Sequence, residues 1–425
     1  MDIETLTKTS APGKIPDSPL FVAEINDPSF KLHGWVVIHS FALRGSCGGV
    51  RLYPDVCREE AELLAKAMTY KYSFYEVALG GAKAAVRLPF DLPLADRAAM
   101  LRKFGEHIAP LIKSRIYWPW TDMNSTSDDI MSIYHGAGVK VGTLPGNSAY
   151  FTALSTFSAV LAAAEYYRIA PEKCSITIEG LGTVGKYLAI EIDRWGGRLI
   201  GASTRIGAVA DPKGLDIKEI IKASEKYNDS WVDENGNWEK ISKEQLFSLP
   251  MKVHIPCART HSLTETVATD LNCTVVVPAA NVPCTPGGEL KINEKGIRLL
   301  PDFIVNSGGV VGPGLENLGI SDDEIRNLFF SDFKEMLARL LRLSDRNQTP
   351  ATTLASLQSN KNFRKLWVSG RGKTARPVRK QRLFSNGARN RGILEVLTQR
   401  IHTPKRLLLK NRVSEIKRIL NERFT

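Results

Sequence analysis

The chain has 425 residues, of which 43% are hydrophobic and 24% are charged, and it carries a formal net charge of +12. A chain of this length is too long to fold around one hydrophobic core, which predicts two domains with an appendage. No apolar run approaches the roughly 18 residues of a membrane-spanning helix, the six cysteines form no C-x-x-C pair, and the seven histidines show no metal-ligand spacing, which argues against a membrane protein, a disulfide scaffold and a metal site.

The first part of the chain, residues 1–147, is predicted to be a mixed α/β substrate domain. Residues 1–18 mix charges with prolines and hold no signal-peptide core, so a cytoplasmic location is expected. An apolar run predicts a strand over 34–39, bounded by turn glycines that include Gly48 and Gly49. Apolar spacing predicts a helix over 58–72 with Lys71 near its end. A short strand over 76–79 and a glycine turn should then precede Lys83, followed by an amphipathic segment over 95–112.

Residues 148–320 are predicted to form a Rossmann-type, doubly wound dinucleotide-binding domain. After an alanine-rich helix over 149–167, a strand over 174–179, a helix over 186–194 and a strand over 198–203 frame a glycine loop of the form G-x-G-x-x-G. In that setting the first glycine permits a tight turn, the second lets a pyrophosphate approach, and the third permits close helix packing. The loop consists of Gly180, Leu181, Gly182, Thr183, Val184 and Gly185. Later apolar runs over 253–256, 274–277 and 303–305 are expected to be parallel strands.

The cofactor is predicted to be NAD or NADP. About 20 residues after the glycine loop, an acidic residue would hold the adenosine ribose of NAD. This chain has Thr204 and Arg205 there instead. Arg205 could pair with a 2′-phosphate, which favours NADP, although an arginine that simply faces solvent is the alternative.

Residues 321–425 are predicted to be a helical, strongly basic extension. A helix is expected over 322–343, a flexible basic linker over 360–391 and a basic amphipathic helix over 406–424. Residues 331–425 hold 23 Lys and Arg against 6 Asp and Glu, a net charge of +17, which leaves −5 for residues 1–330. The segment could bind an anionic surface or nucleic acid, but its few aromatic residues and lack of a binding motif make docking on this chain or on a neighbouring subunit the preferred reading.

Lys71 and Lys83 stand twelve residues apart beside paired glycines, an arrangement that suits ammonium chemistry. A lysine acts as a base near neutral pH only if burial or a nearby cation lowers its pKa. Two surface lysines near a turn would be the plain alternative. We expect the charge of Lys71 to contribute to that lowering, and Asp122 to limit the total charge.

Five motifs in this order resemble the glutamate/leucine/phenylalanine/valine dehydrogenase family over residues 32 to about 316. They are the segments 48–55, 68–71 with 80–83, 121–124, 180–185 and 306–310. The resemblance implies that Lys71 anchors the substrate α-carboxylate, that Lys83 is the base, and that Asp122 shuttles protons with the imine nitrogen. It also implies that Asn281 and Asn306 lie near the nicotinamide, where satisfied turn asparagines are the alternative, and that the chain forms a homo-oligomer.

Some positions depart from the family. Glutamate-specific members usually carry lysine where Cys47 stands, beside the substrate-binding Gly48 and Gly49, and members specific for leucine or phenylalanine are apolar there. An apolar or aromatic amino acid is therefore favoured over glutamate. Pro278 and Lys252 replace acidic residues of the family pattern, and they leave open a catalytically weak homologue that binds anions or nucleic acid through its basic tail.

Overall fold

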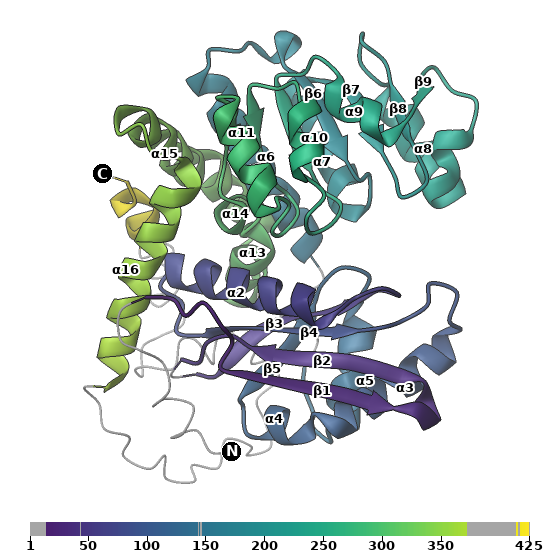
Figure 1. Ribbon diagram of the computed structural model, residues 1–425, viewed down its shortest axis with the longest axis vertical. Coiled ribbons are helices and arrows are strands. Elements are labelled where there is room, and N and C mark those ends of the chain that lie inside the picture. The colour runs from purple at the N-terminus through teal and green to yellow at the C-terminus, as the bar shows by residue number, and fades with distance from the viewer. Residues whose placement is uncertain are drawn as a thin grey trace. The chain divides into compact units, whose positions relative to one another are not determined.

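A computed structural model describes residues 14–42, 44–142, 144, 147–371, 414 and 417–424. The chain divides into two compact α/β units, as its sequence predicts (Figure 1). The described residues of the first unit are those up to 144 and those from 356 to 371, and the second unit contains 147–355 with the described residues near the C-terminus. The segment predicted as a separate extension is thus shared between the two units.

The first unit is built on a five-stranded mixed sheet in the order β1-β2-β4-β3-β5. Its strands are β1 (Phe21–Asp27), β2 (Leu32–Ile38), β3 (Ser46–Leu52), β4 (Gly80–Val86) and β5 (Tyr117–Thr121). Its helices are α2 (Arg58–Phe74), α3 (Leu94–His107), α4 (Ala109–Lys113) and α5 (Ser127–Gly136). Strand β2 pairs antiparallel with β1 and β4, whereas β3 runs parallel to β4 and β5. The amphipathic segment predicted over 95–112 is therefore two helices, separated at Ile108 ahead of Pro110.

The two faces of this sheet bury different partners. Because side chains alternate along a strand, Val50, Ala82 and Ala84 pack with Phe104 of α3 and Ile133 of α5 in one core. The opposite face packs on α2 through Trp35, Val37, Ala61, Ala65 and Ala85. Residues 51 and 83 share the parity of Ala85, so the sheet directs them toward α2.

The paired glycines of this unit lie inside strands, which corrects the expected turns. Gly48 and Gly49 belong to β3, and β4 begins at Gly80 rather than over 76–79. The packing explains why glycine is needed there. A Cβ on Gly80 would lie 2.0 Å from the Ser40 carbonyl oxygen, and one on Gly81 would lie 2.2 Å from the Thr69 amide nitrogen of α2. Glycine weakens a strand in general, but here it lets neighbouring backbone approach closely.

The second unit contains a seven-stranded sheet in the order β12-β11-β10-β6-β7-β8-β9. Its strands are β6 (Ser175–Glu179), β7 (Arg198–Ser203), β8 (Ala208–Ala210), β9 (Glu239–Ile241), β10 (Val253–Pro256), β11 (Val275–Val276) and β12 (Arg298–Leu299). Its helices up to residue 317 are α6 (Ser148–Tyr166), α7 (Thr183–Trp195), α8 (Ile217–Tyr227), α9 (Lys243–Ser248), α10 (Glu265–Asp270), α11 (Pro286–Glu294), α12 (Asp302–Val305) and α13 (Gly308–Asn317). The strands from β12 to β7 run parallel to one another, and β8 runs antiparallel to both of its neighbours, β7 and β9.

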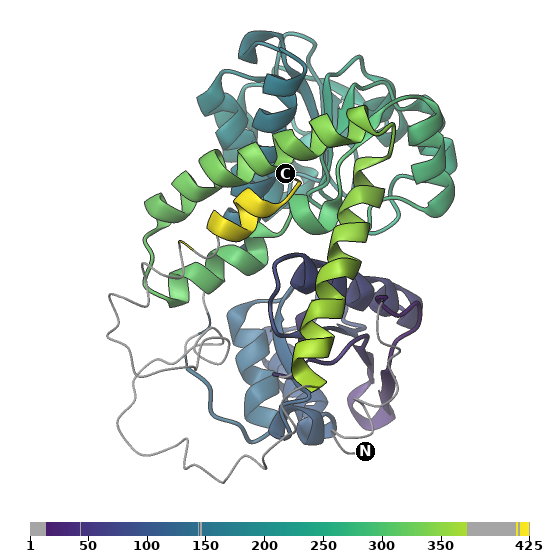
Figure 2. The same ribbon diagram turned by 90° about the vertical axis from the view of Figure 1, so that its left-hand side faces the viewer.

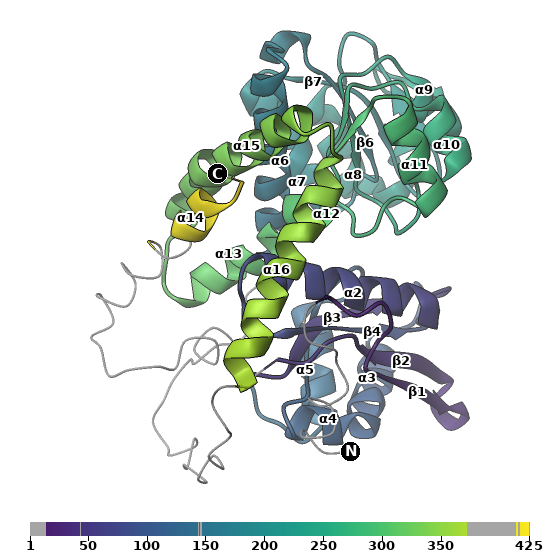
Figure 3. The ribbon, with the colours of Figure 1, turned by 60° about the vertical axis from the view of Figure 1, so that its left-hand side comes forward.

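This parallel order, with β6 central and helices on both faces, is the doubly wound arrangement that was predicted. Figure 3 shows α9, α10 and α11 together on one side of the sheet, and their apolar residues Phe247, Ala268 and Ile292 share a core. The strand predicted over 303–305 is wrong. These residues form the short helix α12 after Pro301, and β12 ends just before it, since a short apolar run does not distinguish a strand from a buried helical turn.

The predicted helix over 322–343 corresponds to α14 (Asp322–Leu328), a π-helical turn (Phe329–Phe333) and α15 (Lys334–Arg346). Helix α16 (Ala351–Arg371) follows, so residues 360–371 are helical and not the predicted linker. Residues 372–413 lie outside the described part of the chain, as does most of the predicted helix over 406–424. Residues 417–422 are helical and lie beside α15 (Figure 2). Ile419 and Leu420 are buried. The Arg339 guanidinium donates to the Leu420 carbonyl at 2.6 Å.

Candidate active site

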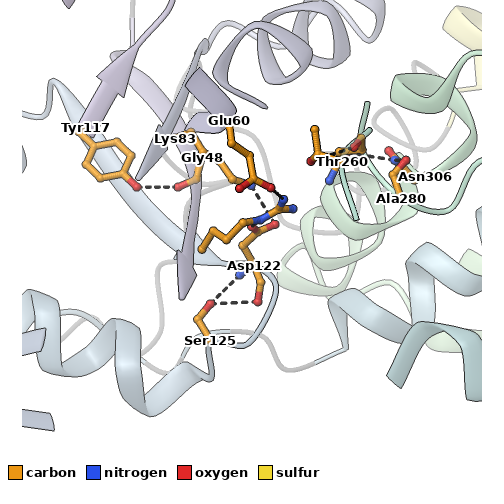
Figure 4. Close-up of polar contacts among 11 residues, drawn as sticks. Gly48, Glu60, Lys83, Tyr117, Asp122, Ser125, Thr260, Ala280 and Asn306 are labelled. Atoms are coloured by element: carbon orange, nitrogen blue, oxygen red, sulfur yellow. Dashed lines mark hydrogen bonds and ion pairs between the residues drawn. The ribbon is translucent and has the colours of Figure 1, made fainter. Parts of the chain in front are cut away.

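Lys83 and Asp122 form a buried ion pair in the first unit. Lys83 lies in β4 and Asp122 follows β5, on the two strands that flank β3. The distance from Lys83 Nζ to Asp122 Oδ1 is 2.8 Å, and the two side chains are 2% and 13% exposed (Figure 4). Ser125 fixes the backbone of Asp122, because the Asp122 amide donates to its hydroxyl at 2.7 Å. The structure thus brings together the predicted base and the predicted proton shuttle.

Gly48 and Gly49 make this pairing possible. A Cβ on Gly49 would lie 2.6 Å from the Asp122 Cβ, and one on Gly48 would lie 1.6 Å from the Ala82 carbonyl oxygen. The Tyr117 hydroxyl donates to the Gly48 carbonyl at 3.0 Å. Any larger side chain at either glycine would push apart the strands that carry Lys83 and Asp122.

Arg51 and Glu60 complete the cluster, and sequence reasoning did not select them. Arg51 Nε donates to Asp122 Oδ2 at 2.9 Å, and its NH1 group donates to Glu60 Oε1 at 2.7 Å. Arg51 is 5% exposed and Glu60 11% exposed in their side chains. The sequence did offer one sign of Arg51: it stands two positions after the paired glycines, where its side chain points to the same face of the sheet as Lys83.

The charges of this cluster set the pKa values of its members. Burial would raise the pKa of Asp122, but the charges of Lys83 and Arg51 outweigh burial and hold it below its usual value. Burial lowers the pKa of Lys83, Asp122 opposes this, and Arg51 adds to the lowering. The neighbouring cation that acts on Lys83 is therefore Arg51, in the place where the sequence suggested Lys71.

Lys71 and Cys47 are both buried. Lys71 lies near the C-terminal end of α2 and is 4% exposed, so it is not one of two surface lysines. Burial raises the pKa of the Cys47 thiol to about 11, and a hydrogen bond joins this thiol to the hydroxyl of Tyr72, which follows Lys71 on α2. Cys47 is thus a neutral, unreactive side chain at neutral pH. The anchoring role of Lys71 stays a prediction.

The glycine loop of the second unit has the geometry of a pyrophosphate cradle. Gly180 has a φ of +96°, and Gly182 precedes α7, whose first residues are Thr183 and Val184. A Cβ on Gly182 would meet no atom within 4 Å, whereas one on Gly185 would lie 2.4 Å from the Gly180 carbonyl oxygen. The helix N-terminus therefore opens onto free space beside Gly182, which fits an anionic dinucleotide linker. Leu181 is tied back to β7, since its amide donates to the Ser203 carbonyl at 2.7 Å.

Thr204 and Arg205 directly follow β7, as predicted, and both contact Asp229. The Thr204 hydroxyl donates to the Asp229 carbonyl at 2.9 Å. Arg205 Nε lies 3.2 Å from Asp229 Oδ2, with side chains 56% and 47% exposed. Arg205 is therefore accessible to a ligand but already has a carboxylate beside it, which the sequence did not indicate.

Asn281 and Asn306, which are 25 positions apart in the sequence, are joined side chain to side chain. The Asn306 amide donates to Asn281 Oδ1 at 3.0 Å and to the Ala280 carbonyl at 3.1 Å (Figure 4). Thr260 adds a longer hydrogen bond of 3.4 Å to the Asn281 carbonyl. These contacts lie after β11 and after α12, beyond the carboxyl end of the parallel sheet, where ligands bind in open α/β folds.

Glu179 is a further residue that sequence reasoning missed. It ends β6 immediately before Gly180, and Ser262 donates to its Oε2 at 2.8 Å. Burial raises the pKa of this carboxyl group to about 7. A carboxyl group that adjoins the predicted phosphate-binding glycine loop and whose pKa is near 7 is a functional candidate.

Within the described residues, no group of three or more His, Cys, Asp or Glu side chains could hold a metal ion. The same part of the chain has no helix long and apolar enough to cross a membrane.

A Rossmann-type unit with an open glycine loop, and another unit that buries a lysine and an aspartate as an ion pair, fit a nicotinamide-dependent oxidoreductase. Two family models match this chain: Glutamate/Leucine/Phenylalanine/Valine dehydrogenase over residues 146–367, and Glu/Leu/Phe/Val dehydrogenase, dimerisation domain, over residues 22–137. The chain belongs to this family, and it is an NAD(P)-dependent amino-acid dehydrogenase.

Its relatives include glutamate dehydrogenases of both cofactor types. The NADP-specific glutamate dehydrogenase of Saccharolobus shibatae is 26% identical over 350 residues, which cover 77% of this chain and 82% of that enzyme. The NAD-specific glutamate dehydrogenase of Staphylococcus aureus is 29% identical over 293 residues, 65% of this chain and 70% of that one. The solved hetero-hexameric glutamate dehydrogenase from Thermus thermophilus shares the fold, with a TM-score of 0.71, 22% identity, and coverage of 82% of this chain and 89% of that chain.

Proposed function

We propose that this protein interconverts an L-amino acid with an apolar or aromatic side chain and the corresponding 2-oxo acid plus ammonia. The observation that carries the proposed reaction is the buried pair of Lys83 and Asp122. Lys71 anchors the α-carboxylate, Lys83 takes the proton of the attacking water, and Asp122 exchanges a proton with the substrate nitrogen. The glycine loop of the second unit would hold the nicotinamide cofactor, which would supply the hydride-accepting chemistry, and the protein supplies orientation and charge.

The preference for an apolar side chain rests on Cys47. A neutral, buried thiol offers no charge to a γ-carboxylate, and burying that carboxylate without a partner would be costly. The relatives from Saccharolobus shibatae and Staphylococcus aureus are both named as glutamate dehydrogenases, so glutamate is the competing substrate. The test follows the absorbance of reduced nicotinamide with leucine, phenylalanine, valine, tryptophan and glutamate, using NAD and NADP in turn. We expect kcat/KM for the best apolar substrate to exceed that for glutamate by roughly tenfold or more. A preference for glutamate would overturn the substrate assignment, and no turnover with any substrate would overturn the reaction.

NADP is the proposed preferred cofactor, because Arg205 stands where an acidic residue would select NAD. The contact between Arg205 and Asp229 is an exposed ion pair, and exposed ion pairs contribute little free energy. A 2′-phosphate could therefore displace the Asp229 carboxylate and take the guanidinium in a stronger, charge-assisted contact.

Variants of these two residues should change the cofactor preference in opposite directions. Arg205→Ala is expected to weaken NADPH binding by roughly tenfold while leaving NADH binding nearly unchanged. Asp229→Asn should strengthen NADPH binding, because Arg205 loses its competing partner. Fluorescence titration of each reduced cofactor measures this without turnover. Arg194→Ala, at the opposite end of α7 from the glycine loop, is the control. Equal losses for both cofactors in Arg205→Ala would contradict the proposed preference.

The chain is also proposed to act as a homo-oligomer. The support is the family model that describes residues 22–137 as a dimerisation domain, and the matched Thermus thermophilus enzyme is described as hetero-hexameric. Light scattering coupled to size-exclusion chromatography should give a mass that is a multiple of 47.0 kDa. A monomer at assay concentrations would contradict this proposal.

A further inference from the structure

The Arg51 guanidinium bridges two buried carboxylates, one of which belongs to the proposed catalytic pair. It donates from Nε to Asp122 at 2.9 Å and from NH1 to Glu60 at 2.7 Å. Because Arg51 occupies Asp122 Oδ2, Lys83 meets the other oxygen, Oδ1, at 2.8 Å. The planar guanidinium presents its donors in a fixed fork, so these contacts fix the direction of the Asp122 carboxylate.

The cluster is electrically balanced and enclosed. Lys83, Arg51, Asp122 and Glu60 contribute two positive and two negative charges, and none of their side chains is more than 13% exposed. Glu60 lies in the first turn of α2, where the helix dipole favours a negative charge. Glu60 therefore holds Arg51 from the side opposite Asp122.

We propose that Arg51 is a positioning residue for the amino-acid dehydrogenase reaction, which aims the Asp122 carboxylate and tunes Lys83 through its charge. This inference rests on the proposed function of Lys83 and Asp122. Arg51 itself need not contact substrate. A purely structural arginine, which only joins β3 to α2 through Glu60, is the competing explanation.

The two explanations differ in their effect on Lys83. The charged or titratable groups that act on it include Asp122 after β5, Arg51 and Cys47 on β3, and Glu60 on α2. Arg51 lowers the pKa of Lys83 and Glu60 raises it to a smaller extent. Removing both residues should therefore raise the pKa of Lys83. At a fixed neutral pH the neutral amine would then be scarcer, by about tenfold for each unit of change.

The test compares Arg51→Met/Glu60→Gln, which keeps the cluster neutral and avoids a stranded buried carboxylate, with Arg51→Lys, which keeps the charge. The control is Arg326→Met/Glu191→Gln. That pair joins α14 to α7 in the second unit, with contacts of 2.8 and 2.5 Å and side chains 26% and 3% exposed. The readouts are kcat/KM as a function of pH and the midpoint of thermal unfolding.

We expect the first double variant to move the rising limb of the pH profile to higher pH, and to lose at least roughly tenfold in kcat/KM at pH 7. Arg51→Lys should keep the rising limb close to its wild-type pH, because the positive charge remains. It should not keep the full rate, because an ammonium group cannot donate two hydrogen bonds in the fixed planar geometry of a guanidinium. The control should lower the unfolding temperature and leave the profile in place. An unmoved profile in both Arg51 variants would overturn the proposal.

A second measurement separates this proposal from the proposed function. In protein labelled with ¹³C at lysine Cε, the Lys83 resonance, assigned by its loss in Lys83→Met, reports protonation without any substrate. An upward shift of its titration midpoint in Arg51→Met/Glu60→Gln supports the action of Arg51 on Lys83 even if no amino acid is turned over. An unchanged midpoint overturns it even if the wild-type enzyme is active.

Discussion

Lys83→Met is expected to lower kcat by roughly a thousandfold while leaving the Kd for reduced nicotinamide cofactors unchanged. A positioned acid or base contributes about 10²–10⁴ in rate, and methionine fills a similar space without a proton to exchange. The variant should fold, because Asp122 keeps its contact with Arg51 at 2.9 Å and is not left as an unpaired buried charge. The proposed cofactor site belongs to the other compact unit, so the affinity for the cofactor reports whether that unit is intact.

Steady-state rates at saturating amino acid and fluorescence titration of the cofactor measure the two quantities separately. Lys103→Met is the control, since Lys103 lies in α3 of the same unit and pairs with Glu106 on the surface. It should behave like the wild-type enzyme. If Lys83→Met kept more than about a tenth of the wild-type rate, the role of Lys83 as base would be wrong.

The sequence identifies this pair because its signals are local and ordered. Lys83 follows paired glycines and Asp122 follows an aromatic strand, and their match to a family pattern carries both roles. The strand-glycine loop-helix unit of residues 175–195 is equally local, so its strand was predicted to within one residue, while its helix begins three residues before the predicted start. What the sequence could not show is that Gly48 and Gly80 lie inside strands, because their close neighbours, Ala82 and Ser40, lie more than 30 positions away in the chain.

Arg51, Glu60 and Asp229 were missed for the same reason. Arg51 acquires its meaning from Asp122, which is 71 positions away and follows β5, a strand that β3 pairs with only after folding. Glu60 matters only through Arg51, and Asp229 only through Arg205. Residue type alone would assign all three to the solvated surface, which is the usual place for Arg, Glu and Asp. The error over residues 303–305 has another origin, since three apolar residues contain too little periodicity to separate a strand from a helical turn.

Glu179 is expected to make the stability of the protein depend on pH between about 4.5 and 7. Its pKa is raised from 4.5 to about 7 by burial, while the Ser262 hydroxyl partly opposes the shift. Between these two values the folded protein binds the proton more tightly than the unfolded chain does. Stability from this group is therefore fully present below pH 4.5 and is lost as pH rises to 7. The full shift corresponds to at most about 3 kcal/mol, an upper limit because part of the side chain reaches solvent.

Glu179→Gln removes this loss, because glutamine stays neutral and can still accept a hydrogen bond from Ser262. Urea unfolding at pH 5 and at pH 8 should show the variant gaining up to about 3 kcal/mol relative to wild type on going to the higher pH. The control is Glu172→Gln, an exposed glutamate just before β6, whose difference from wild type should be the same at both values. A constant difference for Glu179→Gln as well would show that the carboxyl group titrates as it does in water. In that case the glycine loop has no neutral carboxylic acid beside it at physiological pH, and Glu179 would meet an incoming pyrophosphate as a full negative charge.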